Sequence, residues 1–108
     1  MKNIQLTCAH ALVKFLIAQK TLIDGKKEPL FPGVFGIFGH GNVACLGQAL
    51  QENQKKLPTW RGHHEQNMAL TGIAYSRAKR RKQIFVATSS VGPGSTNMIT
   101  AAAVAMSN

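Results

Sequence analysis

The 108-residue sequence predicts an α/β fold in which a parallel sheet is flanked by helices. Segments with helical apolar spacing alternate with short β-prone segments, and the two clearest β-prone segments each lead into a glycine-rich turn that opens a helix. Strands and helices that alternate in this order form right-handed crossovers between parallel strands. The chain has the length of one domain, since single domains usually contain about 100–150 residues.

The first half of the chain predicts two helices and one buried strand. Residues 9–17 have apolar side chains at helical spacing, and Thr7 is placed to cap this helix. Residues 24–29 have the composition of a turn. The apolar residues 34–38 predict a buried strand, and Asn42 is expected to cap a second helix after it.

Residues 51–58 are polar and predict a surface loop, followed by a short strand at 59–61. A third helix is expected from Glu65, with an apolar stripe at helical spacing on one side. It ends at the basic run 79–82, where cations stabilise the helix C-terminus.

Residues 83–88 are the clearest predicted strand, and a glycine-rich loop at 89–95 leads to a last helix over 96–106. This helix is apolar nearly all round, which is typical of a helix buried on several sides. No further strand follows to cover it before Asn108. Either a partner covers the helix or the sequence is the front piece of a longer chain, and the second interpretation is favoured.

The charge is strongly basic, with 13 Lys and Arg against 4 Asp and Glu for a net charge of +9. Such an excess makes a small nucleic-acid-binding α/β module the alternative from a different functional class. The basic residues lie in loops and at a helix end, at 26–27, 55–56 and 79–82, and the aromatic residues lie mostly in the strands. Without aromatic residues between the cations, a solvated surface is favoured over a nucleic-acid site.

Cysteine usage and hydropathy indicate a cytoplasmic protein without disulfides. Cys8 and Cys45 are far apart and form no C-x-x-C pair, and Cys45 is expected to be a small buried residue. No apolar run approaches the ~20 residues that span a bilayer, and no signal peptide is visible.

Glu65 is the strongest candidate for chemistry among the polar residues. A carboxylate in the first turn of a helix is stabilised by the helix dipole, which is its simplest interpretation. Glu65 is also in register with the apolar stripe of its helix, and a carboxylate facing a core needs a hydrogen-bond partner or a proton. It is therefore a candidate acid, base or ligand-binding group with a raised pKa.

Two glycine-rich turns at the same predicted sheet edge could expose backbone N–H groups to a ligand, or could simply be tight turns. Neither contains the dinucleotide fingerprint G-x-G-x-x-G or a P-loop. Beside Glu65, His63 and His64 suggest a metal site, but H-E-x-x-H is absent, so exposed or structural histidines are favoured. The turn residues singled out are Gly39, His40, Gly41, Asn42, Gly92, Pro93 and Gly94.

Residues 34–43, 64–66 and 87–97 together resemble the N-terminal pyrimidine-binding domain of thiamine-diphosphate-dependent enzymes of the acetolactate synthase superfamily. The Glu-Gln pair and the Gly-Pro-Gly-x-Thr-Asn run carry most of this resemblance. The Gly-His-Gly-Asn turn, the insertion at 24–32 and the basic run resemble a hydrolase branch that opens a cyclic 1,2-diketone in myo-inositol catabolism. Another carboligase or decarboxylase of the superfamily is the alternative within this class.

The resemblance implies a role for Glu65. It would hydrogen-bond N1′ of the cofactor's aminopyrimidine and promote the imino tautomer, which takes the proton from C2 of the thiazolium. Residues 39–42 would line the cofactor and substrate cleft, and residues 92–94 would form its wall and part of a dimer contact. One departure is Asn67, at a position where the superfamily usually has glycine.

The resemblance also implies that residues 1–108 form a partial pyrimidine-binding domain. The middle domain and the domain that binds diphosphate and Mg²⁺ are absent from this sequence, which contains no Gly-Asp-Gly motif. A homodimer or higher oligomer would complete the active site. These residues alone are therefore expected neither to catalyse nor to hold the cofactor tightly.

Overall fold

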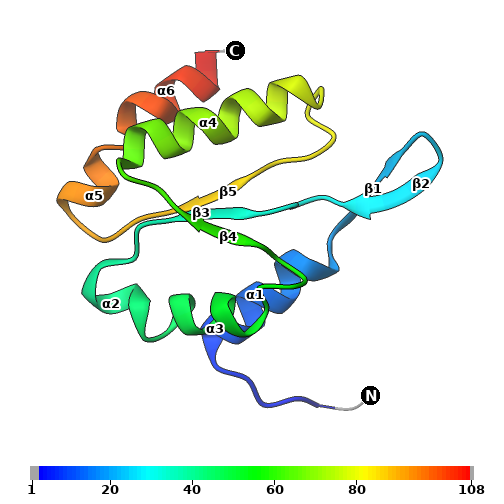
Figure 1. The fold of residues 1–108 in the computed structure, drawn as a ribbon, viewed down its shortest axis with the longest axis horizontal. Helices are drawn as coiled ribbons and strands as arrows, with labels where there is room; N and C mark the ends of the chain where they lie inside the picture. Colours follow the sequence, from blue (N-terminus) through cyan, green and yellow to red (C-terminus); the bar gives the residue numbers. More distant parts are fainter. Residues whose placement is uncertain (1–2, 108) are drawn as a thin grey trace.

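The structure, a computed structural model, describes residues 3–107 and confirms the α/β fold (Figure 1). Its centre is a parallel sheet with the strand order β4-β3-β5. The strands are β3 (Val34–Gly36), β4 (Thr59–Arg61) and β5 (Val86–Thr88). Helices α1, α2 and α3 cover one face of this sheet, and α4 and α6 cover the other (Figure 1).

Two predicted helix starts are confirmed by their caps. The Oγ1 atom of Thr7 accepts a hydrogen bond from the backbone N–H of His10, and α4 begins at Glu65 as expected. The helices are α1 (Cys8–Ala18), α2 (Gly39–Val43), α3 (Leu46–Glu52), α4 (Glu65–Ala78), α5 (Pro93–Thr96) and α6 (Ile99–Ser107).

The main core lies between the sheet and the lower helices. It contains the buried side chains of Val13, Val34, Ala49, Leu50 and Leu57. Leu57 lies in the segment that the sequence predicts as a polar surface loop, yet it is fully buried. The loop is therefore fixed by one apolar anchor just before β4.

A row of aromatic rings from β3, β4 and the residue before β5 packs against α4. The Phe35 ring lies 4.7 Å from that of Phe85 and 6.1 Å from that of Trp60, measured between centroids. Tyr75 of α4 meets Phe85 edge-on at 4.8 Å. These rings connect β3, β4 and the residue just before β5 to the helix that carries Glu65.

A β-hairpin replaces most of the predicted turn at 24–29. Its strands are β1 (Lys20–Ile23) and β2 (Lys26–Pro29), paired antiparallel. Asp24 and Gly25 both have positive φ, 51° and 79°, as a tight hairpin turn of the primed type requires. Only these two residues turn the chain, so the prediction was wrong for residues 26–29.

The segment after β3 differs from the predicted turn and cap. Residues 39–42 belong to the short helix α2, and Asn42 does not cap α3, which begins three residues after Val43. The side chain of Asn42 instead donates to the backbone carbonyl of Ser89, a contact 47 residues away in sequence. Cys45 is exposed, so its predicted burial was wrong.

The last predicted helix is divided into α5 and α6. Within α6 only Ala101 is buried, and the side chains of Ile99 and Met106 are 64% and 88% exposed. Burial of this helix on several sides is therefore not found in the described residues. β5 is also shorter than predicted, since it begins at Val86. Among the described residues, no helix is long and apolar enough to cross a membrane.

Candidate functional site

Three loops meet at the carboxyl edge of the parallel sheet (Figure 1). The loop after β3 opens α2 at Gly39, the loop after β4 opens α4 at Glu65, and the loop after β5 opens α5 at Pro93. Carboxyl ends of parallel strands lie at one edge, which is where α/β folds bind ligands. The predicted convergence of the two glycine-rich segments and Glu65 is therefore confirmed in outline.

The loops after β3 and β5 are in direct contact. A Cβ atom built on Gly39 would lie 2.5 Å from the Cβ of Ser90, so this position has no room for a side chain. Gly39 also has a φ of +69°, which favours glycine. Together with the 3.2 Å hydrogen bond from Asn42 Nδ2 to the Ser89 carbonyl, this contact holds the two loops together.

Glu65 is half-buried and faces the segment between α5 and α6. Its Oε1 accepts a hydrogen bond from Asn97 Nδ2 at 3.2 Å. A Cβ atom built on Gly94 would lie 3.2 Å from Glu65 Oε2 and would also overlap Ser90. Gly94 is buried, and its missing side chain is what allows the carboxylate to approach this backbone.

The hydrogen bonds to Glu65 set its ionisation. The bond from its own backbone N–H and then the bond from Asn97 lower the pKa of Glu65 below its ordinary value. Partial burial acts in the opposite direction and is outweighed, while the neighbouring His64 lowers the pKa slightly further. The raised pKa expected from the sequence was therefore wrong for the described chain, because the carboxylate meets donors rather than apolar side chains.

The remaining predicted residues lie in the segments that follow β3 and β5. His40 and Gly41 are exposed on α2, and a Cβ on Gly41 would meet nothing within 4 Å. Gly92 has a φ of +68°, and Pro93 occupies the first turn of α5. Gly92, like Gly41, borders open space, since a Cβ there would also meet nothing within 4 Å.

Two residues at this edge were not predicted from the sequence as part of the site. Asn97 binds Glu65, and Ser90 packs against both Gly39 and Gly94. Asn97 closes the Gly-Pro-Gly-x-Thr-Asn run, which was the available signal. Nothing in the sequence pairs it with a carboxylate 32 residues earlier.

Of the two histidines beside Glu65, His64 has a structural role as a helix cap. His64 is the N-cap of α4, and its ring Nδ1 accepts a hydrogen bond from the backbone N–H of Gln66 at 3.2 Å. His63 and His64 are both exposed. In residues 3–107 no group of three or more His, Cys, Asp or Glu side chains could hold a metal ion.

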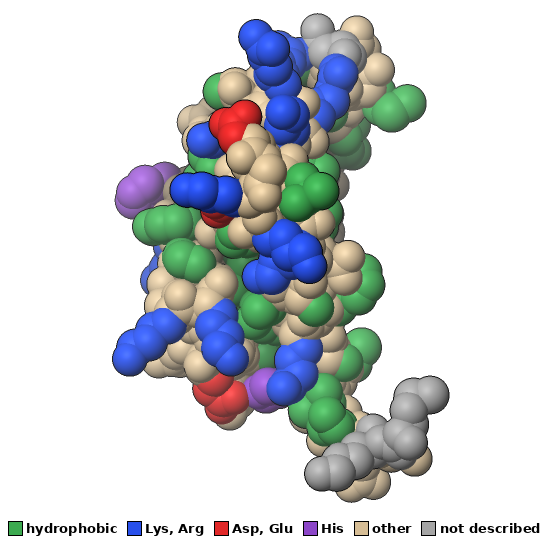
Figure 2. All heavy atoms as spheres, turned by 90° about the vertical axis from the view of Figure 1, so that its right-hand side faces the viewer, with side chains coloured by type: hydrophobic (Ala, Val, Ile, Leu, Met, Phe, Trp, Pro, Cys, Tyr) green, Lys and Arg blue, Asp and Glu red, His purple; other side chains and the backbone are tan. Residues whose placement is uncertain are grey.

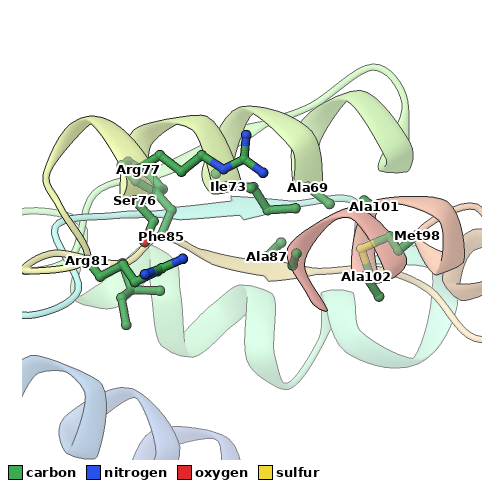
Figure 3. A pocket seen from close by; sticks show the side chains of 13 residues that line it. Ala69, Ile73, Ser76, Arg77, Arg81, Phe85, Ala87, Met98, Ala101 and Ala102 are labelled. Carbon is green, nitrogen blue, oxygen red and sulfur yellow. The ribbon is translucent and has the colours of Figure 1, made fainter. Parts of the chain in front are cut away.

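A separate cavity of about 410 Å³ lies between α4, β5 and α6 (Figure 3). Small and apolar side chains, including Ala69, Ile73 and Ala101, line most of it, and Arg77 and Arg81 lie together at one end (Figure 3). Glu65 does not line this cavity. The cavity therefore belongs to the helical face of the sheet rather than to the site at its carboxyl edge.

Comparison with known proteins decides the family. Residues 18–108 match the model of the thiamine pyrophosphate enzyme, N-terminal TPP binding domain. The chain belongs to this family. Membership in the thiamine pyrophosphate enzymes favours an enzyme over the nucleic-acid-binding alternative, and it agrees with the α/β fold.

Two similar relatives of the chain are both named 3D-(3,5/4)-trihydroxycyclohexane-1,2-dione hydrolase. The protein of Geobacillus thermodenitrificans is 54% identical over all 108 residues, and that of Bacillus thuringiensis is 52% identical over the same length. The chain spans 17% of the length of these curated relatives.

Proposed function

We propose that this chain is part of a thiamine-diphosphate-dependent hydrolase that opens the ring of 3D-trihydroxycyclohexane-1,2-dione to 5-deoxy-glucuronate by C–C cleavage in inositol catabolism. The observation that carries this proposal is that the chain, aligned over its full length, is 52–54% identical to relatives named as that hydrolase. Residues 1–108 would form part of the pyrimidine-binding domain. The middle domain and the ligands of the diphosphate and Mg²⁺ would lie outside them.

The residues at the sheet edge fit the aminopyrimidine of the cofactor in one testable respect. Because Gly94 has no side chain, the carboxylate of Glu65 reaches the backbone of α5, where Asn97 binds its Oε1. At the same edge, α2 leaves open space at Gly41, where a Cβ would meet nothing within 4 Å. His40, Asn42, Gly92 and Pro93 would border the cleft, and a second subunit would complete it.

Thiamine diphosphate supplies the electron sink for cleavage of a C–C bond next to a carbonyl. The contribution of this chain is the Glu65 carboxylate. Because its pKa is lowered, Glu65 is ionised at neutral pH and would accept a hydrogen bond from a ring nitrogen that carries a proton. Asn97 holds Oε1 in place, so the carboxylate is oriented before a ligand arrives.

The first test is turnover of the dione by the complete enzyme with Glu65→Gln. Glutamine keeps the size of the side chain but cannot take a proton, so turnover should fall by about 10²-fold or more. Glu28→Gln in the hairpin, away from the sheet edge, is the matched control and should retain normal turnover. Near-normal turnover of Glu65→Gln would show that the role proposed for this carboxylate is wrong.

The chain alone should neither turn over the dione nor bind thiamine diphosphate tightly. In the proposal, the residues that bind the diphosphate and Mg²⁺ lie outside residues 1–108, and Glu65 supplies only one contact to the cofactor. Titration calorimetry of the 108-residue chain with thiamine diphosphate and Mg²⁺ measures this directly. Micromolar binding would contradict the proposed division of the site.

A further inference from the structure

Ser90 lies where the loop after β5 meets both glycine-rich segments. A Cβ atom built on Gly39 would lie 2.5 Å from Ser90 Cβ, and one built on Gly94 would overlap Ser90 Oγ. The Cβ position at Gly94 also lies 3.2 Å from Glu65 Oε2. The hydroxyl of Ser90 and the carboxylate of Glu65 therefore lie beside the same bare stretch of backbone.

Three side chains hold the backbone around Ser90 in place. Ser95 Oγ donates to the Ser90 carbonyl at 2.8 Å, and Ser89 Oγ donates to the same carbonyl at 3.1 Å. Asn42 Nδ2 donates to the preceding carbonyl, that of Ser89, at 3.2 Å. Ser90 is therefore fixed in position before any ligand arrives, as residues of a binding site need to be.

The hydroxyl of Ser90 differs from the other hydroxyls of its loop. Ser89, Ser95 and Thr96 each donate to a backbone carbonyl of the same loop. Within residues 3–107, Ser90 Oγ has no hydrogen-bond partner. No half-buried side chain of this part of the molecule has a polar atom that is both shut off from solvent and unpaired, so this hydroxyl is open to solvent.

Packing accounts for the Cβ of Ser90 but not for its Oγ. Alanine would make the same contact with Gly39, because the close approach there is to the Cβ. A hydroxyl without an internal hydrogen bond adds little to stability. A fixed and accessible hydroxyl beside a carboxylate is instead typical of the few polar groups that orient a bound ligand.

The surroundings of Ser90 favour an uncharged ligand group over an anion. Residues 37–47 and 89–98, which include the loops after β3 and β5, contain no Lys or Arg. Lys and Arg side chains gather instead on the right-hand side of Figure 1, whereas α2 and α5 lie on the left (Figure 2). Because phosphate groups are bound most strongly by such cations, Ser90 suits an uncharged polar ring rather than a diphosphate.

We propose that Ser90 is a ligand-binding residue of this site, and that its hydroxyl hydrogen-bonds an uncharged ring ligand at the edge where Glu65 lies. A hydroxyl can donate to a ring nitrogen or a carbonyl oxygen, and it can accept from an N–H or O–H group. The aminopyrimidine of thiamine diphosphate and the polyhydroxylated dione both carry such groups. The inference rests on the proposed function, which supplies these two ligands.

The complete enzyme with Ser90→Ala tests this inference, since alanine keeps the Cβ that packs on Gly39 and removes only the hydroxyl. Titration calorimetry with thiamine diphosphate and Mg²⁺ gives the Kd of the cofactor, and steady-state kinetics give the KM of the dione. Loss of one neutral hydrogen bond should raise one of these constants about 3- to 10-fold. A raised Kd identifies the cofactor as the partner of Ser90, and a raised KM with an unchanged Kd identifies the dione.

Two controls separate ligand binding from a structural role. A contact that binds ground state and transition state equally raises KM without lowering kcat, so kcat at saturation should stay close to that of the parent enzyme. Ser76→Ala removes a half-buried serine that lines the separate cavity between α4, β5 and α6. This variant should leave the Kd of the cofactor and the KM of the dione unchanged.

Unchanged Kd and KM in the Ser90→Ala enzyme would overturn the inference, and so would equal increases in the Ser76→Ala enzyme. A Ser90→Ala enzyme that melts at a lower temperature and loses kcat together with both affinities would also overturn it, because this pattern indicates lost packing. If the parent enzyme binds thiamine diphosphate but does not turn over the dione, the proposed function is wrong. A raised cofactor Kd in the Ser90→Ala enzyme would still support the role of Ser90 in that case.

Discussion

Replacing Gly94 with alanine tests the close packing on which the site at the sheet edge depends. The new Cβ would overlap Ser90 Oγ, its nearest neighbour, and would lie 3.2 Å from Glu65 Oε2. Contacts of this kind force side chains to shift, at a cost of about 1–3 kcal/mol. Alanine in a helix offsets about 0.5–1 kcal/mol of this, because glycine is the poorer helix former. The expected net loss of stability is therefore about 0.5–2 kcal/mol.

A second substitution identifies the cause of this loss. Ser90→Ala removes the Oγ atom but keeps the Cβ, which would lie 3.4 Å from the new methyl group, an ordinary contact. Ser90→Ala alone should change stability by at most about 0.5 kcal/mol. In that background, Gly94→Ala should become nearly neutral, because the remaining close contact is with the flexible end of Glu65.

Urea unfolding of the four proteins, followed by circular dichroism and by the fluorescence of the single tryptophan, Trp60, measures the coupling. We expect the double variant to be more stable than the sum of the single changes by about 1 kcal/mol. Additive effects within about 0.3–0.5 kcal/mol would refute the packing argument. So would a Gly94→Ala variant that is more stable than the parent chain.

Two further predictions concern the lower half of the molecule. Leu57→Ala removes a fully buried side chain and should destabilise the chain by about 2–5 kcal/mol in the same urea assay, whereas Leu22→Ala on the exposed hairpin should cost at most about 0.5 kcal/mol. The hydrogen bond from His10, and then the one from Gln48, lower the pKa of Glu52 below its ordinary value of 4.5. Glu52 should therefore stabilise the fold above pH 4.5, and this stabilisation should be lost as the pH falls through the lowered pKa. A His10→Ala variant should lose less stability than the parent over that acid range, and an equal loss would contradict the assignment.

Local signals in the sequence predicted the parts of the fold that depend on neighbouring residues. Thr7 and Glu65 mark helix starts that the structure confirms, because a cap acts within one turn. Asp24-Gly25 was also a usable hairpin signal, but the lysine-rich strand after it lacks the apolar alternation that usually identifies a strand. The hairpin was therefore missed although its turn was located.

Contacts between distant segments account for the parts that could not be predicted. Asn42 has the chemistry of a helix cap, yet it bonds to the carbonyl of Ser89 on another loop. After the bond from its own backbone N–H, the bond from Asn97, 32 residues away, is the next largest cause of the lowered pKa of Glu65. The sequence predicted Glu65 at the carboxyl edge of the sheet, but it did not show that Asn97 would meet this carboxylate.

The outer strands of the short parallel sheet have a consequence for handling the isolated chain. β4 and β5 are both edge strands within the described residues, and their outer backbone groups face away from β3. β4 carries Arg61 and follows Pro58, two features that discourage edge-to-edge pairing, whereas β5 (Val86–Thr88) is uncharged. Self-association should therefore proceed through β5. The net charge of +9 opposes it through repulsion between molecules, so concentrated stocks should remain clearer at low ionic strength than in high salt.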